Sequence, residues 1–189
     1  MRIIAGRCRG TRLEAVAGMD TRPTADRVKE GLFNTIQMEV TPETRVLDVF
    51  AGTGALGLEA LSRGAANAVF IEESAAARKV IERNIRKCRC EAKCQILAGD
   101  ARAILARLSG RQFELIFLDP PYRAGLYDAA FSLIKEYQLL ADFGIIIAEY
   151  AKNALFFHDD TLFLKYKSKT YGDTEIHFYK HPDTHGRDS

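Results

Sequence analysis

The sequence predicts an α/β fold in which a mostly parallel sheet is covered by helices on both faces and ends in an antiparallel hairpin. Short apolar runs alternate with segments of helical periodicity between residues 45 and 150. Two further strand-like runs then follow each other with no helix between them. The chain has 189 residues, of which 47% are apolar, so it is long enough to bury the core of one domain.

The parallel strands are expected where the apolar runs are continuous, at residues 46–50, 68–71, 94–97, 114–118 and 144–148. Strands of this kind are buried on both faces, as in a helix-covered parallel sheet. Helical segments connect the strands at residues 55–63, 75–87, 101–108 and 127–137. Residues 162–167 and 175–179 are predicted to form the final hairpin, because Gly172 and Asp173 between them are typical turn residues.

Residues 1–44 are predicted to form a small N-terminal arm made of a hairpin and a helix. Strands are expected at 2–5 and 12–16, and a helix is expected to open at Thr21–Thr24 with Thr24 or Asp26 as its cap. Residues 45–181 are predicted to form the main domain, and the polar residues 182–189 are expected to be a frayed tail.

The composition argues against a membrane-spanning, secreted or zinc-binding protein. No apolar stretch approaches the roughly 18 residues that a membrane span needs, and the N-terminus lacks the apolar core of a signal peptide, so a cytoplasmic location is expected. Cys88, Cys90 and Cys94 lie close together, but a one-residue first gap and the lack of a second pair favour reduced thiols over zinc. No metal and no obligate protein partner are predicted.

Charge is uneven although the net charge is only +2. Basic residues without an intervening acid occupy the start of the chain, at Arg2, Arg7, Arg9 and Arg12. Such an arm is typical of a protein that meets a polyanion at one end. A solvated charged hairpin explains the same pattern, and charge alone does not decide between the two.

A glycine-rich loop follows the first parallel strand. Gly52, Gly54 and Gly57 match the dinucleotide fingerprint G-x-G-x-x-G, and Glu72 lies twenty residues on, at the end of the second strand. A nicotinamide dinucleotide must therefore be considered. However, Asp48 directly precedes the loop, where its charge would repel the pyrophosphate that such a site receives at the helix N-terminus.

Acidic residues also end the later strands, and they favour S-adenosylmethionine, which carries a sulfonium and an ammonium but no phosphate. Glu72 is expected to accept from the ribose hydroxyls, and Asp100 to face the adenine amino group. The glycines let the backbone approach the methionine portion closely. The predicted cofactor residues are Asp48, Phe50, Gly52, Gly54, Glu72, Asp100 and Ala101.

The fourth strand ends in Asp119-Pro120-Pro121-Tyr122. Prolines remove backbone donors, so Asp119 and the carbonyl of Pro120 are free to accept both protons of one amino group. That arrangement favours a pyramidal nitrogen whose lone pair can point at the sulfonium methyl, and Tyr122 offers a face on which a base can stack. A rigid proline turn at a strand end is the plain structural alternative.

Several segments together resemble the RsmD-type bacterial small-subunit ribosomal RNA (guanine-N2) methyltransferases. The resemblance covers residues 1 to about 180 and lies in Arg2–Gly6 with Gly10, Arg22–Thr24, Asp26–Glu30, Leu32–Asn34, Leu47–Ala65, Asp119–Tyr122 and Tyr171–Thr174. It implies a class I S-adenosylmethionine-dependent methyltransferase fold, Rossmann-like with seven strands, that methylates guanine N2 in 16S rRNA or the small ribosomal subunit. The residues expected to contact RNA phosphates are Arg7, Arg9, Arg12, Arg22 and Arg27.

Two other functions remain in view. The tetrapeptide also occurs in DNA adenine-N6 methyltransferases, although the chain has no evident additional segment for reading a duplex sequence. The third hypothesis is a non-catalytic RNA-binding assembly factor that kept the fold, and the intact Asp119–Tyr122 motif speaks against it. The departures from the family pattern are Cys8, where a larger residue is usual, and the cluster at Cys88–Cys94.

Overall fold

The computed structural model describes residues 1–16, 23–121, 125–152 and 161–182. Its centre is a seven-stranded sheet in the order β3-β2-β1-β4-β5-β7-β6. The strands from β1 to β5 are parallel, and β7 and β6 run antiparallel at one edge. The strand bounds are β1 Arg45–Asp48, β2 Asn67–Glu72, β3 Cys94–Ala98, β4 Phe113–Leu118, β5 Leu140–Ala151, β6 Leu164–Tyr171 and β7 Thr174–Lys180. The predicted mixed sheet with its terminal hairpin is confirmed.

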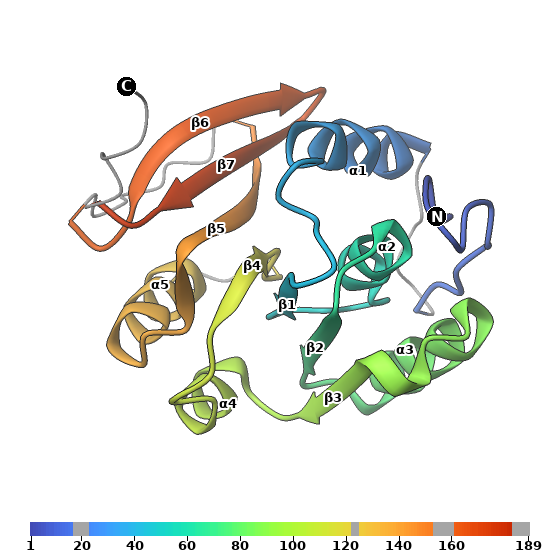
Figure 1. Cartoon of the computed structure of the whole chain (residues 1–189), viewed down its shortest axis with the longest axis horizontal. Helices are drawn as coiled ribbons and strands as arrows, with labels where there is room; N and C mark the ends of the chain where they lie inside the picture. The colour runs from blue at the N-terminus through green and yellow to red at the C-terminus, as the bar shows by residue number, and fades with distance from the viewer. Residues whose placement is uncertain (17–22, 122–124, 153–160, 183–189) are drawn as a thin grey trace.

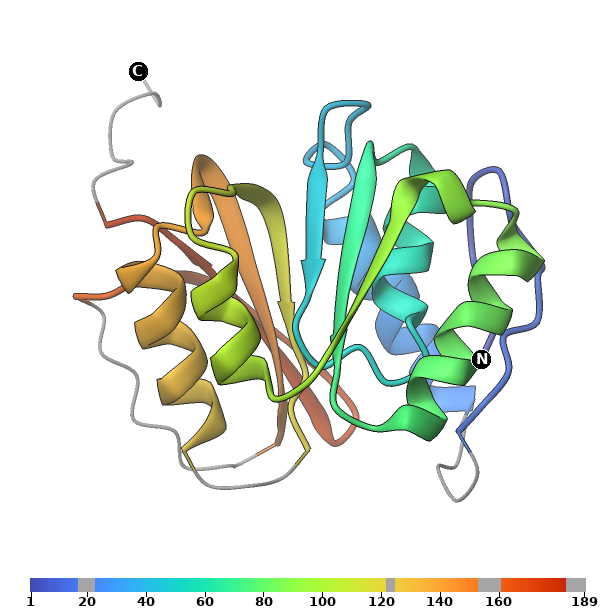
Figure 2. The ribbon, with the colours of Figure 1, turned by 90° about the horizontal axis from the view of Figure 1, so that it is seen from below.

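Helices cover both faces of the sheet, as Figures 1 and 2 show. The helices are α1 Pro23–Thr35, α2 Ala55–Arg63, α3 Ala75–Cys88, α4 Ala101–Arg107 and α5 Leu126–Glu136, with a 3₁₀ turn at Glu91–Lys93. α1, α2 and α3 lie with the N-terminal arm on one face, and α4 and α5 lie on the other (Figure 2). Each side has its own apolar core, the first built around Phe33, Phe70 and Phe117 and the second around Phe113 and Phe131.

The order of the strands places the ligand-binding region. The chain leaves β1 toward β2 and β3, and later returns to place β4 on the other side of β1. Open α/β sheets bind their ligands outside the carboxyl ends of the strands at such a switch point. In this sheet that point lies between β1 and β4, so the segments that follow Asp48 and Leu118 converge there.

Two strands differ from their predicted bounds by more than two residues at one or both ends. β5 begins at Leu140 rather than 144, because an irregularity opposite Phe113 and Leu115 lets the chain pair before and after Gly144. A Cβ on Gly144 would come within 2.9 Å of the Phe113 carbonyl oxygen, so only glycine fits this approach. β6 extends to Tyr171, which leaves Gly172 and Asp173 as a two-residue hairpin turn with Gly172 at φ 60°.

The expected N-terminal hairpin is reduced to one isolated bridge between Arg2 and Arg12. The strands do not extend because several of the arm's backbone donors have partners outside the arm. The N–H groups of Ile4 and Ala5 donate to the carboxylate of Glu59 at 2.8 and 3.0 Å, and the N–H of Arg7 donates to the Ser62 carbonyl at 2.8 Å. Both partners belong to α2, so the arm is fastened to a helix as well as to itself, where the N–H groups of Ile3 and Leu13 donate to the carbonyls of Thr11 and Met1.

The first helix begins at Pro23, within the segment where the sequence predicts its start. Asp26, a predicted cap, serves another purpose: its carboxylate accepts from the Arg2 N–H at 3.1 Å and pairs with the Arg2 side chain at 3.6 Å. The side chain of Thr24 lies outside the described part of the chain. No helix within the described residues is long and apolar enough to cross a membrane.

Candidate active site at the carboxyl ends of β1 and β4

The glycine-rich loop joins β1 to α2. Two of its glycines are needed for the backbone conformation and the third for close packing. Gly52 and Gly54 have positive φ angles of 54° and 76°, which residues with a side chain rarely adopt. Gly57 is helical, but a Cβ there would meet the buried ring of Phe70 at 2.4 Å. The third glycine therefore allows α2 to pack directly on β2, as in the dinucleotide fold.

Asp48 is buried at the end of β1 and points at the start of α2. Its Oδ2 accepts from the Gly57 N–H at 3.2 Å. Burial raises the pKa of Asp48 to about 7, and the nearby Asp119 and Glu72 add to the effect. A pyrophosphate at this helix N-terminus would thus meet a donor that is already occupied and a repelling carboxyl group.

Glu72 ends β2 and holds the cofactor loop. Its two oxygens accept from the Gly52 N–H at 2.9 Å and the Ser74 N–H at 2.8 Å. The carboxylate is half-buried and keeps lone pairs for further donors. It is therefore fixed beside the loop by two backbone bonds, where a ribose could reach it.

The third strand end carries Asp100 and Ala101. Asp100 is the N-cap of α4, accepts from the Arg102 N–H at 2.9 Å and pairs with the Arg102 guanidinium at 3.0 Å. Its predicted contact with an adenine amino group would use the lone pairs that these bonds leave. Ala101 is buried, and Phe50, also predicted to touch the cofactor, is half-buried against the core on the α4 side.

Asp119 directly follows β4 at the predicted reaction centre. Its side chain is accessible to solvent, whereas Pro120 is buried. Desolvation by the surrounding chain raises the pKa of Asp119 to about 6. Tyr122, the predicted stacking residue, lies outside the described residues.

Glu149 is a carboxyl group at this site that the sequence analysis missed. It lies on β5, one residue beyond the pairing of Leu118 with Ala148, so it neighbours Asp119 on the adjacent parallel strand. Burial raises the pKa of Glu149 to about 8, and the charge of Asp119 acts in the same direction. The one signal in the sequence is a single acid interrupting the apolar run from Gly144 to Tyr150.

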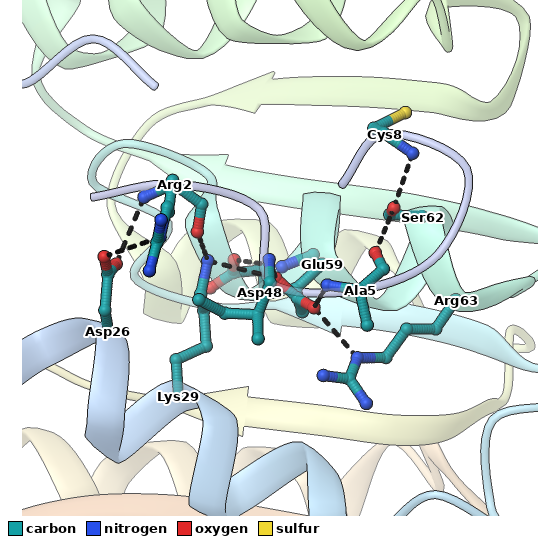
Figure 3. Close-up of polar contacts among 11 residues, drawn as sticks. Arg2, Ala5, Cys8, Asp26, Lys29, Asp48, Glu59, Ser62 and Arg63 are labelled. Carbon is teal, nitrogen blue, oxygen red and sulfur yellow. Dashed lines mark hydrogen bonds and ion pairs between the residues drawn. The ribbon is translucent and has the colours of Figure 1, made fainter. Parts of the chain in front are cut away.

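The N-terminal arm is tied to α2 through a buried cluster of charges (Figure 3). Glu59 is fully buried and accepts from the two arm N–H groups, from Lys29 at 3.1 Å and from Arg63 at 2.8 Å. Lys29, itself buried, also donates to the Arg2 carbonyl at 2.6 Å. The arm, α1 and the helix that starts at the cofactor loop therefore meet at one carboxylate.

A second connection joins the arm to the loop itself. The buried side chain of Asn84 on α3 accepts from the Glu14 N–H at 2.7 Å. Its amide nitrogen donates to the carbonyl of Glu14 at 3.1 Å and to that of Thr53 at 2.9 Å. Thr53 lies between Gly52 and Gly54, so the arm and the glycine loop share one side-chain amide.

The described members of the predicted RNA-contacting arginines lie at the surface, and Arg7 is placed away from Asp119. Arg7, Arg9, Arg12 and Arg27 are all exposed, and Arg22 lies outside the described residues. The Arg7 guanidinium donates to the carbonyl of Arg89, just after α3. That helix end precedes β3, so Arg7 lies at the edge of the sheet opposite the carboxyl ends.

The four cysteines are free thiols packed into the core. Cys8, Cys88 and Cys90 are buried and Cys94 is half-buried. The Cys8 thiol donates to the Cys88 carbonyl at 3.2 Å, and the Cys90 and Cys94 sulfurs are 3.7 Å apart. Within the described parts of the chain, no three side chains of the metal-binding types are grouped to hold an ion.

Comparisons with known proteins relate most of the chain to one family. The family model described as Conserved hypothetical protein 95 matches residues 1–180. Ribosomal RNA small subunit methyltransferase D of Escherichia coli K12 is 38% identical over 149 residues, which cover 79% of this chain and 74% of the relative. The Bacillus subtilis protein YlbH is 38% identical over 95% of this chain and 98% of its own length.

Solved structures agree with the sequence relatives. The Escherichia coli protein yhhF superposes with a TM-score of 0.84 at 32% identity, covering 96% of this chain and 97% of that one. The Thermus thermophilus protein TTHA0928 gives a TM-score of 0.80 at 26% identity over 95% of this chain. The chain thus belongs to the Conserved hypothetical protein 95 family, the family of the ribosomal RNA small subunit methyltransferases D.

Proposed function

We propose that this protein transfers a methyl group from S-adenosylmethionine to the N2 amine of a guanine in 16S rRNA, as free RNA or within the small ribosomal subunit. The observation that carries the proposal is the position of Asp119 and Pro120 beside the glycine loop, at the carboxyl ends of the adjacent strands β4 and β1. Family membership supports the methyltransferase chemistry and the ribosomal RNA substrate.

The residues present suit S-adenosylmethionine as the cofactor. Carboxyl groups lie at the ends of β1, β2 and β4, namely Asp48, Glu72 and Asp119, and they favour a ligand with positive charge. Asp48 also occupies a donor at the α2 N-terminus that a pyrophosphate would need. When bound, the cofactor supplies an electrophilic methyl group on a sulfonium, and Glu72 is placed to accept from its ribose.

The remaining chemistry is orientation of the amine. An exocyclic amine of a base is conjugated with the ring and is a poor nucleophile. The Asp119 carboxylate and the Pro120 carbonyl accept its two protons, which holds the nitrogen in the pyramidal form with its lone pair directed at the methyl group. Tyr122 is proposed to stack on the base, and the exposed arginines Arg7, Arg9, Arg12, Arg22 and Arg27 to bind RNA phosphates.

Replacing Asp119 tests the mechanism. Asp119→Ala is expected to abolish transfer of labelled methyl groups to undermethylated small subunits while binding of S-adenosylmethionine, followed by calorimetry, persists. The wild-type rate should fall as the pH drops below about 6, because Asp119 then gains a proton and loses an acceptor. Methylation by Asp119→Ala at the wild-type rate would refute the assigned mechanism.

The same assay separates the alternatives. Duplex DNA offered beside rRNA should receive no methyl groups, whereas N6-methyladenine in the DNA would identify a DNA methyltransferase. Binding of rRNA without any binding of S-adenosylmethionine would instead identify a non-catalytic assembly factor. The proposed function requires both cofactor binding and methylated rRNA.

A further inference from the structure

The site contains a carboxyl group that the proposed amine transfer does not use. Glu149 on β5 and Asp119, the residue directly after β4, are neighbours because the two parallel strands pair up to Leu118 and Ala148 and lie about 4.8 Å apart. Phe117 and Ile147, two residues before each, both face the core on the α1–α3 side. Because side chains alternate along a strand, Glu149 is directed to that same side, and Asp119, directly after β4, is close enough for its charge to act on Glu149.

Glu149 has no protein partner for its carboxyl group. The hydroxyl of Tyr127 on α5 donates to the Glu149 main-chain carbonyl, not to its side chain. Across the described residues, neither side-chain oxygen of Glu149 takes part in a hydrogen bond or ion pair. Glu149 is half-buried, and none of the fully buried side-chain oxygens in the described residues lacks a partner, so its carboxyl oxygens still reach the solvent. A carboxyl group that faces a reaction site without a protein partner is available to bond to a ligand.

The charge that acts on Glu149 lies on one side of it, toward β4. Asp119, directly after β4, is the charged group that acts on it. On β7, Ile176 is its pairing partner, while Glu175 and His177 are bonded to each other and His177 packs on Tyr150, on the opposite face. Two adjacent carboxyl groups of this kind cannot easily ionise together, so one of them tends to hold a proton.

We propose that Glu149 selects guanine: its carbonyl oxygen accepts the N1–H of the base, and its protonated oxygen donates to O6, while the adjacent 2-amino group lies at Asp119. The inference rests on the proposed function and supplies the base specificity that Asp119 and Pro120 lack. Guanine presents an amine, a donor and an acceptor in order along this edge. Adenine presents its amine, an acceptor and a C–H, so at most one of the two bonds to Glu149 can form.

Glu149 favours guanine over adenine whether its carboxyl group is protonated or ionised. An ionised Glu149 would still accept from N1–H of guanine, but it would face the lone pair of adenine N1. A site that hydrogen-bonds a substrate group discriminates strongly against an analogue lacking it, because its own polar groups are then left unpaired. Glu149 is therefore assigned to substrate contact and Asp119 to the reacting nitrogen.

Two substitutions distinguish recognition from a structural role. Glu149→Gln keeps one acceptor and one donor and so imitates the protonated acid, whereas Glu149→Leu removes both. Undermethylated small subunits would be incubated with S-adenosylmethionine, and the methylated nucleosides quantified by mass spectrometry. We expect the Gln variant to retain the wild-type rate within about threefold and the Leu variant to lose about 10- to 100-fold, as for the loss of two hydrogen bonds.

Further readouts separate recognition from damage to the fold or the cofactor site. Glu149→Leu should keep its affinity for S-adenosylmethionine and unfold at an equal or higher temperature, because an unpaired carboxyl group is removed. The wild-type rate should fall above about pH 8, when Glu149 loses its proton and repels O6, and the Gln variant should not show this fall. Glu175→Gln and Glu175→Leu, on the opposite face of β7, are the matched controls and should retain activity.

The outcomes are distinct. A Leu variant with the wild-type rate, a Gln variant as inactive as the Leu variant, or an equal loss of cofactor binding would overturn the assignment of Glu149. Wild-type protein that binds the cofactor but forms no N2-methylguanosine would instead refute the proposed function itself.

Discussion

At the residue scale, the site is a group of carboxyl groups with different partners. Glu72 is fixed by two backbone N–H groups and Asp48 by one, whereas Glu149 has no partner among the described residues. The sequence identified Asp48, Glu72 and Asp119 because each ends a predicted strand near a motif. It did not identify Glu149, since one acid within an apolar run marks no motif, and its meaning depends on the register with β4.

Buried carboxyl groups with raised pKa values make the stability depend on pH. The pKa of Asp48 rises from 3.8 to about 7 in the folded protein, so the folded state holds the proton more tightly than the unfolded chain. Its contribution to stability is fully present below about pH 4 and is lost as the pH rises through 7. Asp48→Asn, which keeps an acceptor for Gly57, should therefore flatten the decline of the free energy of unfolding between about pH 4 and pH 7.

The effect of this substitution should be about 2 to 4 kcal/mol at the alkaline end, from 1.36 kcal/mol per pKa unit. Urea unfolding at a series of pH values measures it, with Asp142→Asn at an exposed position as the control. If both variants follow the wild-type curve, the pKa of Asp48 is not raised.

At the scale of elements, continuous apolar runs and the helical periodicity between them were sufficient to predict the parallel strands and α2 to α5. Local sequence failed where a distant partner decides the structure. The arm's donors bind Glu59 and Ser62, more than fifty residues away, so the expected hairpin is reduced to one bridge. Likewise, the early start of β5 depends on the fit of Gly144 against Phe113 rather than on local propensity.

The close contact of α2 with β2 gives a test at this scale. In Gly57→Ala the new methyl group would meet the Phe70 ring at 2.4 Å, and Phe70 is fully buried and cannot move aside freely. Although alanine favours a helix by about 1 kcal/mol, overpacking should win and destabilise the protein by about 1 to 3 kcal/mol in urea unfolding.

A second substitution is the control for this test. Phe70→Leu creates space, so it should be less harmful in the Gly57→Ala background than in the wild type. Additive effects of the two changes would show that the ring does not limit residue 57.

At the scale of the molecule, the N-terminal arm and the main domain form one body. Ile3 and Leu13 of the arm belong to the same apolar core as Phe33 and Phe117. The charge cluster at Glu59 joins the arm and α1 to α2 (Figure 3), and Asn84 joins the arm to the cofactor loop. A segment that the sequence marks mainly by its arginines is thus held firmly against α2 and α3, and it reaches the cofactor loop only near Glu14.

Breaking the cluster should destabilise the whole molecule. Glu59→Gln leaves the ammonium of Lys29 buried without a counter-charge, which should cost about 3 to 5 kcal/mol of the free energy of unfolding. Chemical denaturation measures the loss, and Glu39→Gln provides the same charge change at an exposed site.

The double variant Glu59→Leu with Lys29→Met should recover part of the stability, because it removes both buried charges together. Equal stability of Glu59→Gln and the wild type would mean that the arm is held by its apolar contacts alone.

The central claim is methylation of guanine N2 in small-subunit rRNA with Asp119 at the reacting amine. Undermethylated small subunits incubated with S-adenosylmethionine and the protein, then digested and mapped by mass spectrometry, test it most directly. The expected result is N2-methylguanosine in 16S rRNA with the wild type and none with Asp119→Ala. Methyl groups on adenine, or undiminished N2-methylguanosine with Asp119→Ala, would contradict it.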